Sequence, residues 1–268
     1  MNTIRHPAVA GMFYPGDPAT LAAGINQFLR GAHVAASGGQ PKALIVPHAG
    51  YVYSGATAAA AYATLAPWAA VIRRIILLGP THRVAVEGIA LPEADAFATP
   101  LGTVRLDAQA IAQLAELPQI VFSDGAHAFE HSLEVQLPFL QHILDLFTLV
   151  PLAVGHASPE AVAEVIEQLW GGPETLFVVS SDLSHFLPYG TARQIDSNTC
   201  RHILQLDTHI RPEQACGAFP INGLLLAARR RGMTPTLLAQ CNSGDTAGDK
   251  GRVVGYAAFS FTEGSGHA

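Results

Sequence analysis

The chain has 268 residues, of which 49% are hydrophobic and only 13% charged, and its formal net charge is −6. This composition predicts a packed globular protein and excludes a general nucleic-acid binder, which would need clustered Lys and Arg. No apolar run approaches the ~18 residues of a membrane-spanning helix, and the N-terminus lacks the apolar stretch of a secretory signal. We therefore expect no membrane association. The three cysteines are far apart and odd in number, so we also expect no disulfide framework and a cytoplasmic location.

Helical and strand-like segments alternate along the chain. The first helix is predicted from Asp17 as its N-cap, Pro18 at the first helical position and an apolar face over Leu21–Leu29. Further helical patterns occupy Ser54–Leu65, Asp107–Ala115, Leu133–Leu144, Pro159–Leu169, 191–206 and 221–231. Apolar runs typical of strands occupy Ala43–Val46, Arg74–Leu78, Ile120–Phe122, Leu149–Val154, Thr175–Ser180, Thr236–Ala239 and Val253–Phe261.

Unbroken apolar strands between helices predict an α/β fold whose sheet is covered on both faces. We therefore expect residues 1–268 to form a single domain, with a mixed, mostly parallel, buried sheet flanked by helices. The Gly/Ser-rich residues 35–41 are predicted to form a surface loop, and residues 263–268 a flexible tail.

Three of the predicted strands are followed by histidines. His48 follows the first strand, His82 follows the second, and Asp182 and His185 follow the run Thr175–Ser180. Because ligands bind beyond the carboxyl ends of strands in open α/β sheets, we expect these side chains to converge on one crevice. The alternative for any one of them is an ordinary loop histidine.

A second polar cluster is the sequence EHSLE, in which His131 and Glu134 are three residues apart near the start of a helix. Side chains with this spacing share a helix face, which favours a common functional role. The competing interpretation is that Glu134 only stabilises the first turn through the helix dipole and that His131 caps it.

Cys241 follows another apolar run and could reach the same crevice, although a lone intracellular cysteine is usually a buried, inert thiol. Two imidazoles and a thiolate would suit iron, copper or zinc, and would leave a coordination position open. We expect the sulfur of Cys241 within roughly 4 Å of the ring nitrogens of His48 or His82. Cys200 and Cys216 are expected away from this pocket.

Seven motifs in order resemble the Memo family, whose bacterial and archaeal members are called AmmeMemoRadiSam system protein B. They cover nearly the whole chain and are AGMFYPGD, PHAGYVYSG, GPTH, EHSLEVQLPFL, SSDLSH, CGAFPI and SGDTAGDKGRVVGYAAFSF. The resemblance implies a fold similar to that of class III extradiol dioxygenases, which use non-heme ferrous iron held by two His and one Glu.

In Memo-type proteins the corresponding pocket presents two His and one Cys. Carried over by motif, the implied metal ligands are His48, His82 and Cys241. His185 and Asp182 are implied as catalytic residues, with Asp182 beside a pocket histidine and Glu134 beside His131. The other implied pocket residues are His131, Glu134, Tyr51, Phe13 and Tyr14.

The function implied by the resemblance is a redox protein dependent on iron (Fe²⁺) or copper, with zinc also possible and an unknown substrate. A thiolate in place of a carboxylate makes the site softer, so ring cleavage does not transfer with the fold. The alternatives are a zinc-type hydrolase and a non-catalytic protein that binds a peptide or small ligand. The family name also implies a functional link to an AMMECR1-like protein and a radical SAM enzyme.

Overall fold

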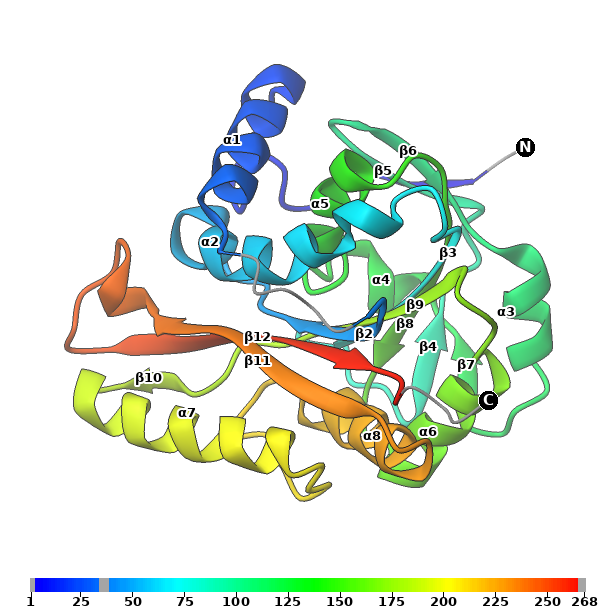
Figure 1. The fold of residues 1–268 in the computed structure, drawn as a ribbon. Coiled ribbons are helices and arrows are strands. Elements are labelled where there is room, and N and C mark those ends of the chain that lie inside the picture. Colours follow the sequence, from blue (N-terminus) through cyan, green and yellow to red (C-terminus); the bar gives the residue numbers. More distant parts are fainter. Residues whose placement is uncertain (1–2, 34–38, 265–268) are drawn as a thin grey trace.

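The computed structural model describes residues 3–33 and 39–264, and its centre is a 9-stranded mixed sheet (Figure 1). In spatial order its strands are β10 (His185–Leu187), β12 (Val253–Thr262), β2 (Pro41–Val46), β9 (Thr175–Ser180), β3 (Arg74–Pro80), β8 (Thr148–Val154), β4 (Ile89–Leu91) and β7 (Ile120–Phe122), with β11 (Thr234–Asn242) paired to β12. The expectation of a mixed, mostly parallel sheet between helices is confirmed, with the parallel strands β2, β9, β3 and β8 at its centre.

Helices cover both faces of this sheet, as Figure 1 shows. One layer contains α1 (Pro18–Gly31), α2 (Tyr51–Tyr62) and α5 (Leu137–Ile143). The other contains α3 (Ala108–Leu114), α6 (Pro159–Gln168), α7 (Tyr189–Leu204) and α8 (Ala218–Arg230). Helix α1 begins as predicted, because Asp17 accepts the Thr20 N–H and Pro18 needs no donor at the first helical position.

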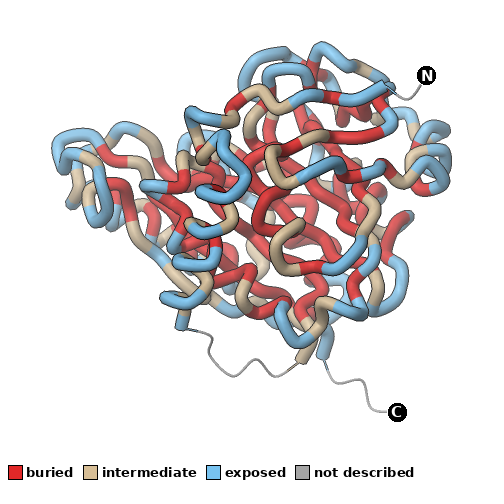
Figure 2. The backbone as a smooth tube through the Cα atoms, turned by 90° about the horizontal axis from the view of Figure 1, so that it is seen from above, coloured by how far each residue is buried: buried red, intermediate tan, exposed pale blue. Residues whose placement is uncertain are grey.

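The strands are buried because alternate residues serve two separate cores. In β2, Ala43 and Ile45 belong to the core beneath α6 and α8, whereas Leu44 and Val46 belong to the core beneath α1 and α2. Every residue of β2 and β9 is buried, which is why their sequences show no polar alternation. Figure 2 shows the buried chain concentrated in the middle of the molecule.

Shorter elements were not predicted. A second, 3-stranded sheet pairs β1 (Ile4–Arg5), β5 (Ala96–Thr99) and β6 (Gly102–Arg105). The short helix α4 (Asp124–Ala128) and the 3₁₀ segments Ala63–Trp68, Glu134–Gln136 and Ser243–Asp245 complete the described elements. The predicted helix over Leu133–Leu144 is divided between the second of these 3₁₀ segments and α5, with Pro138 near the start of the regular helix.

The predicted surface loop and the predicted flexible tail lie partly outside the described residues, namely 35–38 of the loop and 265–268 of the tail. Within the predicted tail, Glu263 is tied to the fold because its carboxylate accepts a hydrogen bond from the Trp170 indole N–H at 3.0 Å. Over the part of the chain that the structure describes, no helix has both the length and the apolar character needed to span a membrane.

Candidate metal centre

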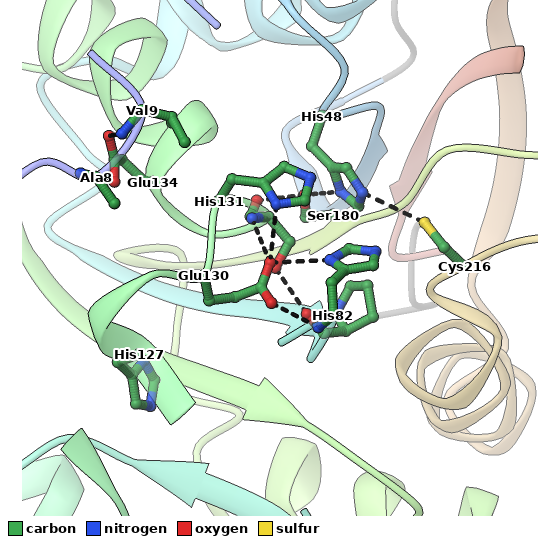
Figure 3. A network of polar contacts seen from close by, with 12 residues as sticks. Ala8, Val9, His48, His82, His127, Glu130, His131, Glu134, Ser180 and Cys216 are labelled. Carbon is green, nitrogen blue, oxygen red and sulfur yellow. Dashed lines mark hydrogen bonds and ion pairs between the residues drawn. The ribbon is translucent and has the colours of Figure 1, made fainter. Parts of the chain in front are cut away.

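Three imidazoles meet at the carboxyl edge of the central sheet. His48 follows β2, His82 follows β3, and His131 lies in the loop before the 3₁₀ segment Glu134–Gln136 (Figure 3). The ring centroids of His48 and His82 are 5.3 Å apart, and that of His131 lies 5.2 Å from the first and 4.7 Å from the second. One nitrogen from each ring lies within 4.8 Å of the others, so the three can hold one metal ion. The predicted proximity of His48 and His82 is confirmed.

The hydrogen bonds of Ser180 determine the tautomer of His48. The Ser180 hydroxyl donates its only proton to the Ser132 carbonyl at 2.6 Å and accepts the Gln136 amide at 2.8 Å. It also lies 2.8 Å from His48 Nδ1 and must accept there, because a hydroxyl has one proton to give. His48 therefore carries its proton on Nδ1 and presents the lone pair of Nε2.

Glu130 fixes the tautomer of His82 and lies close to His131. Its carboxylate accepts both the backbone N–H of His82 at 2.6 Å and the ring Nδ1–H of His82 at 2.9 Å. His131 Nδ1 lies 3.3 Å from the same carboxylate. A carboxylate behind a metal-binding imidazole fixes its orientation and raises its basicity. Sequence reasoning missed Glu130, although the residue directly precedes His131, because the helical i, i+3 spacing drew attention to Glu134.

The electrostatics of the cluster favour neutral His48 and His131 and an ionised Glu130. Burial places the pKa of His48 well below its usual value and lowers the pKa of His131 to about 4. The pKa of Glu130 falls to about 2, because its hydrogen bonds from His82 and Ser132 outweigh the opposing effect of burial. Neutral imidazoles beside a negative charge are the state in which a metal ion binds without first displacing protons.

The cysteine beside this cluster is Cys216, so the predictions for Cys216 and Cys241 are both wrong. Cys216 Sγ lies 3.3 Å from His48 Nε2, although Cys216 was expected away from the pocket. Cys241 instead contacts Thr57 Oγ1 of α2 at 3.1 Å, because it lies on β11 at the outer side of β12. Cys216 reaches the cluster because it lies just before α8 in a loop that packs on Asp182, whose N–H donates to Sγ at 3.3 Å. The expected separation of Cys200 from the cluster fits its place in the core under α7.

Asp182 and His185 both lie near the cluster. Asp182 lies beside a pocket histidine as expected, but its carboxylate accepts the backbone N–H of His48 at 2.8 Å rather than a ring proton. Burial raises the pKa of Asp182 to about 7. His185 begins β10 and is half-buried, and desolvation lowers its pKa.

Glu134 does not pair with His131, and this prediction is also wrong. Its buried carboxylate forms an ion pair with Arg5 and accepts hydrogen bonds from the Ala8 and Val9 N–H groups at 2.7 and 3.0 Å. The Tyr14 hydroxyl donates to the same carboxylate at 2.6 Å. Glu134 thus attaches the N-terminal segment to the fold, and Figure 3 shows it turned toward Ala8 and Val9.

Of the two remaining aromatic residues, Phe13 contacts the cluster, whereas Tyr51 holds a neighbouring segment in place. Phe13 packs on His131 with ring centroids 4.8 Å apart, so it lines the cluster as predicted. Tyr51 starts α2 and donates its hydroxyl proton to the Val135 carbonyl at 2.8 Å, which braces the segment after His131.

Comparisons with known proteins agree over nearly the whole chain. Residues 5–260 match the model of the family described as Memo-like protein. The chain is 37% identical to a MEMO1 family protein of Methanosarcina barkeri, covering 96% of this chain and 99% of the relative. MEMO1 family proteins of Metallosphaera sedula and Aquifex aeolicus are each 34% identical, over 97% and 96% of this chain and 99% of each relative.

Among solved structures, the fold is similar to that of an uncharacterized protein from Escherichia coli K12, with a TM-score of 0.52. That similarity covers 81% of this chain and 98% of the other at 13% sequence identity, so it concerns the fold alone.

Proposed function

The chain belongs to the MEMO1 family of Memo-like proteins, and from that premise we propose that it is a metal-dependent redox protein. The observation that carries the proposal is the convergence of His48, His82 and His131 within 4.8 Å of one another. These three residues would hold the ion through the nitrogens that face away from Ser180 and Glu130. The relation to the extradiol dioxygenase fold is part of this proposal and rests on the motif resemblance.

The donor set fits a transition metal of borderline or soft character. Imidazoles suit iron, copper and zinc and poorly suit magnesium or calcium. The Cys216 sulfur beside His48 Nε2 favours iron or copper over zinc, since a thiolate donor makes a site more easily oxidised. Burial raises the pKa of Cys216 to about 12, so the thiolate would form only when a metal displaces the proton. Such an ion would supply one-electron chemistry and a coordination position for substrate.

The protein side chains around the ion have separate roles in this proposal. His185 would exchange a proton with the substrate, since it is half-buried beside the imidazoles. Asp182 would be a positioning residue, because it holds the backbone of His48 and flanks Cys216. Phe13 would shield one face of His131 from water.

A zinc-type hydrolase is the second candidate, and the presence of three imidazoles favours it. Three histidines with an open position are a known donor set for zinc that activates water. Non-catalytic binding of a peptide or small molecule is the remaining alternative. As partners we propose a small organic molecule or peptide, with the link to an AMMECR1-like protein and a radical SAM enzyme resting on the family name.

Reconstitution of metal-free protein distinguishes the candidates. The protein would be loaded separately with Fe²⁺, copper or Zn²⁺ and mixed with catechols and small thiols while oxygen uptake is recorded. The redox proposal expects uptake with iron or copper that disappears in His82→Ala. Ester hydrolysis with zinc and no oxygen uptake with any metal would instead support the hydrolase.

A further inference from the structure

A second cavity, of about 280 Å³, lies between α7 and the end of β11. It does not include the three imidazoles, and the proposed metal chemistry makes no use of it. Its lining is almost entirely polar and consists of Tyr189, Arg193, Asp196, Ser197, Gln240, Cys241, Asn242 and Asp245.

One wall is a single face of α7. Arg193, Asp196 and Ser197 follow Tyr189 by four, seven and eight residues, which is the spacing of one helix face. The other lining residues, from Gln240 to Asp245, come from a different part of the sequence, so only the fold brings the two walls together.

The opposite wall is the end of β11. Successive side chains of a strand point to opposite faces, and the Cys241 sulfur is directed toward Thr57 of α2. Gln240 and Asn242 therefore point the other way, toward α7. The Asn242 carbonyl oxygen accepts the Gly244 N–H at 2.9 Å, which leaves the amide nitrogen as a donor.

The cavity contains a positive and a negative group that do not neutralise each other. Arg193 lies over the Tyr189 ring at 5.8 Å, and no carboxylate of the described residues forms an ion pair with it. Asp196 is buried, and one of its carboxylate oxygens accepts the Ser184 N–H at 3.0 Å. The other oxygen packs against Gly255, where an added Cβ would lie 2.0 Å from it, and among the described residues only Ser184 donates to this carboxylate.

The second carboxylate of the lining is already occupied. Asp245 accepts the Tyr189 hydroxyl at 2.5 Å and the Asn242 N–H at 3.0 Å. Lys250 lies over the same tyrosine ring at 4.9 Å, outside the lining. Arg193 and Asp196 are thus the two charges that remain to meet a ligand.

We propose that this cavity binds a small zwitterion of the α-amino acid class, with the ligand carboxylate on Arg193 and its ammonium group on Asp196. A guanidinium matches a carboxylate in a two-pronged hydrogen bond, and a free carboxylate oxygen accepts an ammonium proton. Gln240, Ser197 and the Asn242 amide surround the position of the ligand side chain. The volume lies just under the range usual for drug-sized ligands, so it fits a small metabolite.

The state of Asp196 supports this arrangement. Burial raises its pKa to about 6 although hydrogen bonds from Ser184 oppose this effect, so the buried charge is only partly compensated. An ammonium group would complete the compensation. A simple anion would bring a second negative charge next to Asp196 and would be repelled.

Ligand-detected saturation-transfer NMR tests the proposal. L-serine, L-alanine, L-aspartate and L-glutamine would each be mixed with the full chain at about 10 mM, a concentration that reveals even millimolar affinity. We expect transfer from at least one of them. For that amino acid, the N-acetyl derivative, which lacks the ammonium group, and the carboxamide, which lacks the carboxylate, should each bind at least about tenfold more weakly.

Two substitutions locate the binding. Arg193→Gln and Asp196→Asn should each weaken it by about tenfold or more, because each removes one charged partner. Arg193 is on the surface, so its replacement leaves the fold intact, and Asn at 196 can still accept the Ser184 N–H. Arg201→Gln, on the same helix but outside the cavity, is the matched control and should bind as the parent does. The metal content of all three variants should equal that of the parent, which separates this test from that of the metal centre.

Three results would overturn the proposal. One is the absence of saturation transfer from all four amino acids. Another is equal binding of the N-acetyl derivative or the carboxamide. The third is unchanged binding in both Arg193→Gln and Asp196→Asn.

Discussion

Ser180 and Glu130 are small parts of the protein with a large effect on the metal centre. Each accepts the Nδ1 proton of an imidazole, Ser180 from His48 and Glu130 from His82. Both rings therefore present Nε2, the nitrogen with the free lone pair, without any rearrangement. This preorganisation lowers the cost of ordering ligands when an ion binds.

Glu130→Gln tests that role. The amide keeps the size of the side chain but loses the negative charge and one of the acceptors, so we expect metal affinity to fall by about 10- to 100-fold. Asp207→Asn is a matched control, because Asp207 likewise is a carboxylate beside two imidazoles, those of His202 and His209, at 2.6 Å each, on a separate part of the surface. Competition titration with a coloured chelator measures both. Equal losses in the two variants would contradict a specific role for Glu130.

The cysteine assignment gives a second test at the scale of one residue. Cys216→Ser should weaken binding of copper or iron by about tenfold or more, because the sulfur beside His48 Nε2 is lost. Cys241→Ser should leave affinity unchanged, since its sulfur contacts Thr57 instead. The measurement is an anaerobic metal titration of the two variants and the parent. The reverse pattern would restore Cys241 as the ligand and refute the structural assignment.

At the scale of elements, the end of β3 and the loop that carries His131 must approach closely. A side chain at Gly79 would place its Cβ 2.8 Å from Ser132 Oγ and 2.9 Å from a Leu133 methyl group. Ser132 in turn donates its N–H to Glu130 at 2.9 Å. The absence of a side chain at Gly79 therefore allows the loop to hold Glu130 behind the imidazoles.

Gly79→Ala should displace this loop and lower metal affinity by about tenfold, as losses of a supporting contact do. Gly24→Ala in α1 is the control, because no heavy atom lies within 4 Å of its added methyl group. That substitution should leave affinity unchanged and favour the helix slightly. The same chelator titration applies, and an unaltered affinity in Gly79→Ala would show that the approach of the two segments is dispensable.

Helix α4 contains a buried histidine that should make stability depend on pH. His127 donates its Nε2 proton to the Ala90 carbonyl at 2.9 Å, its Nδ1 has no partner among the described residues, and burial lowers its pKa to about 4. Above its ordinary pKa of 6.5 the residue is neutral in both folded and unfolded chains. Between pH 6.5 and 4 only the unfolded chain takes up the proton. The free energy of unfolding therefore decreases as the pH is lowered through this range.

The protonation of His127 alone lowers the free energy of unfolding by roughly 3 kcal/mol, because its pKa differs by about 2.5 between the folded and unfolded chains. Urea unfolding of the parent and of His127→Phe at pH 7 and pH 4 isolates it, since other titrating groups are common to both proteins. We expect the parent to lose more stability than the variant over this range. Parallel losses in the two proteins would show that His127 titrates normally in the fold.

At the scale of the whole molecule, the sequence was most informative for the strands that are buried on both faces. Two-sided burial made β2, β3, β8 and β9 readable as apolar runs, and β9 was predicted with its actual bounds. The convergence of His48 and His82 followed from their place after parallel strands. Strand β1, of 2 residues, is too short to show a pattern, and β4 was missed although β7, also of 3 residues, was predicted with its actual bounds.

The errors in the site have a common physical cause. Glu134 was assigned by helical spacing, but the segment around it is a 3₁₀ turn, and its carboxylate is required to pair with Arg5, more than a hundred residues away in sequence. The choice among three cysteines depended on which loop returns to the sheet edge, and that is decided by tertiary packing. Glu130 and Cys216 could be recognised only once the chain was folded.

The metal content of the protein tests the central claim most directly. Protein purified without oxygen would be analysed by inductively coupled plasma mass spectrometry, together with His48→Ala, His82→Ala, His131→Ala and the surface control His202→Ala. The account predicts about one transition-metal ion per chain in the parent and in the control, and a loss of most of that ion in each of the other three variants. An ion retained at the parent level in all three of the single variants His48→Ala, His82→Ala and His131→Ala, or no ion in the parent after incubation with iron, copper and zinc, would contradict it.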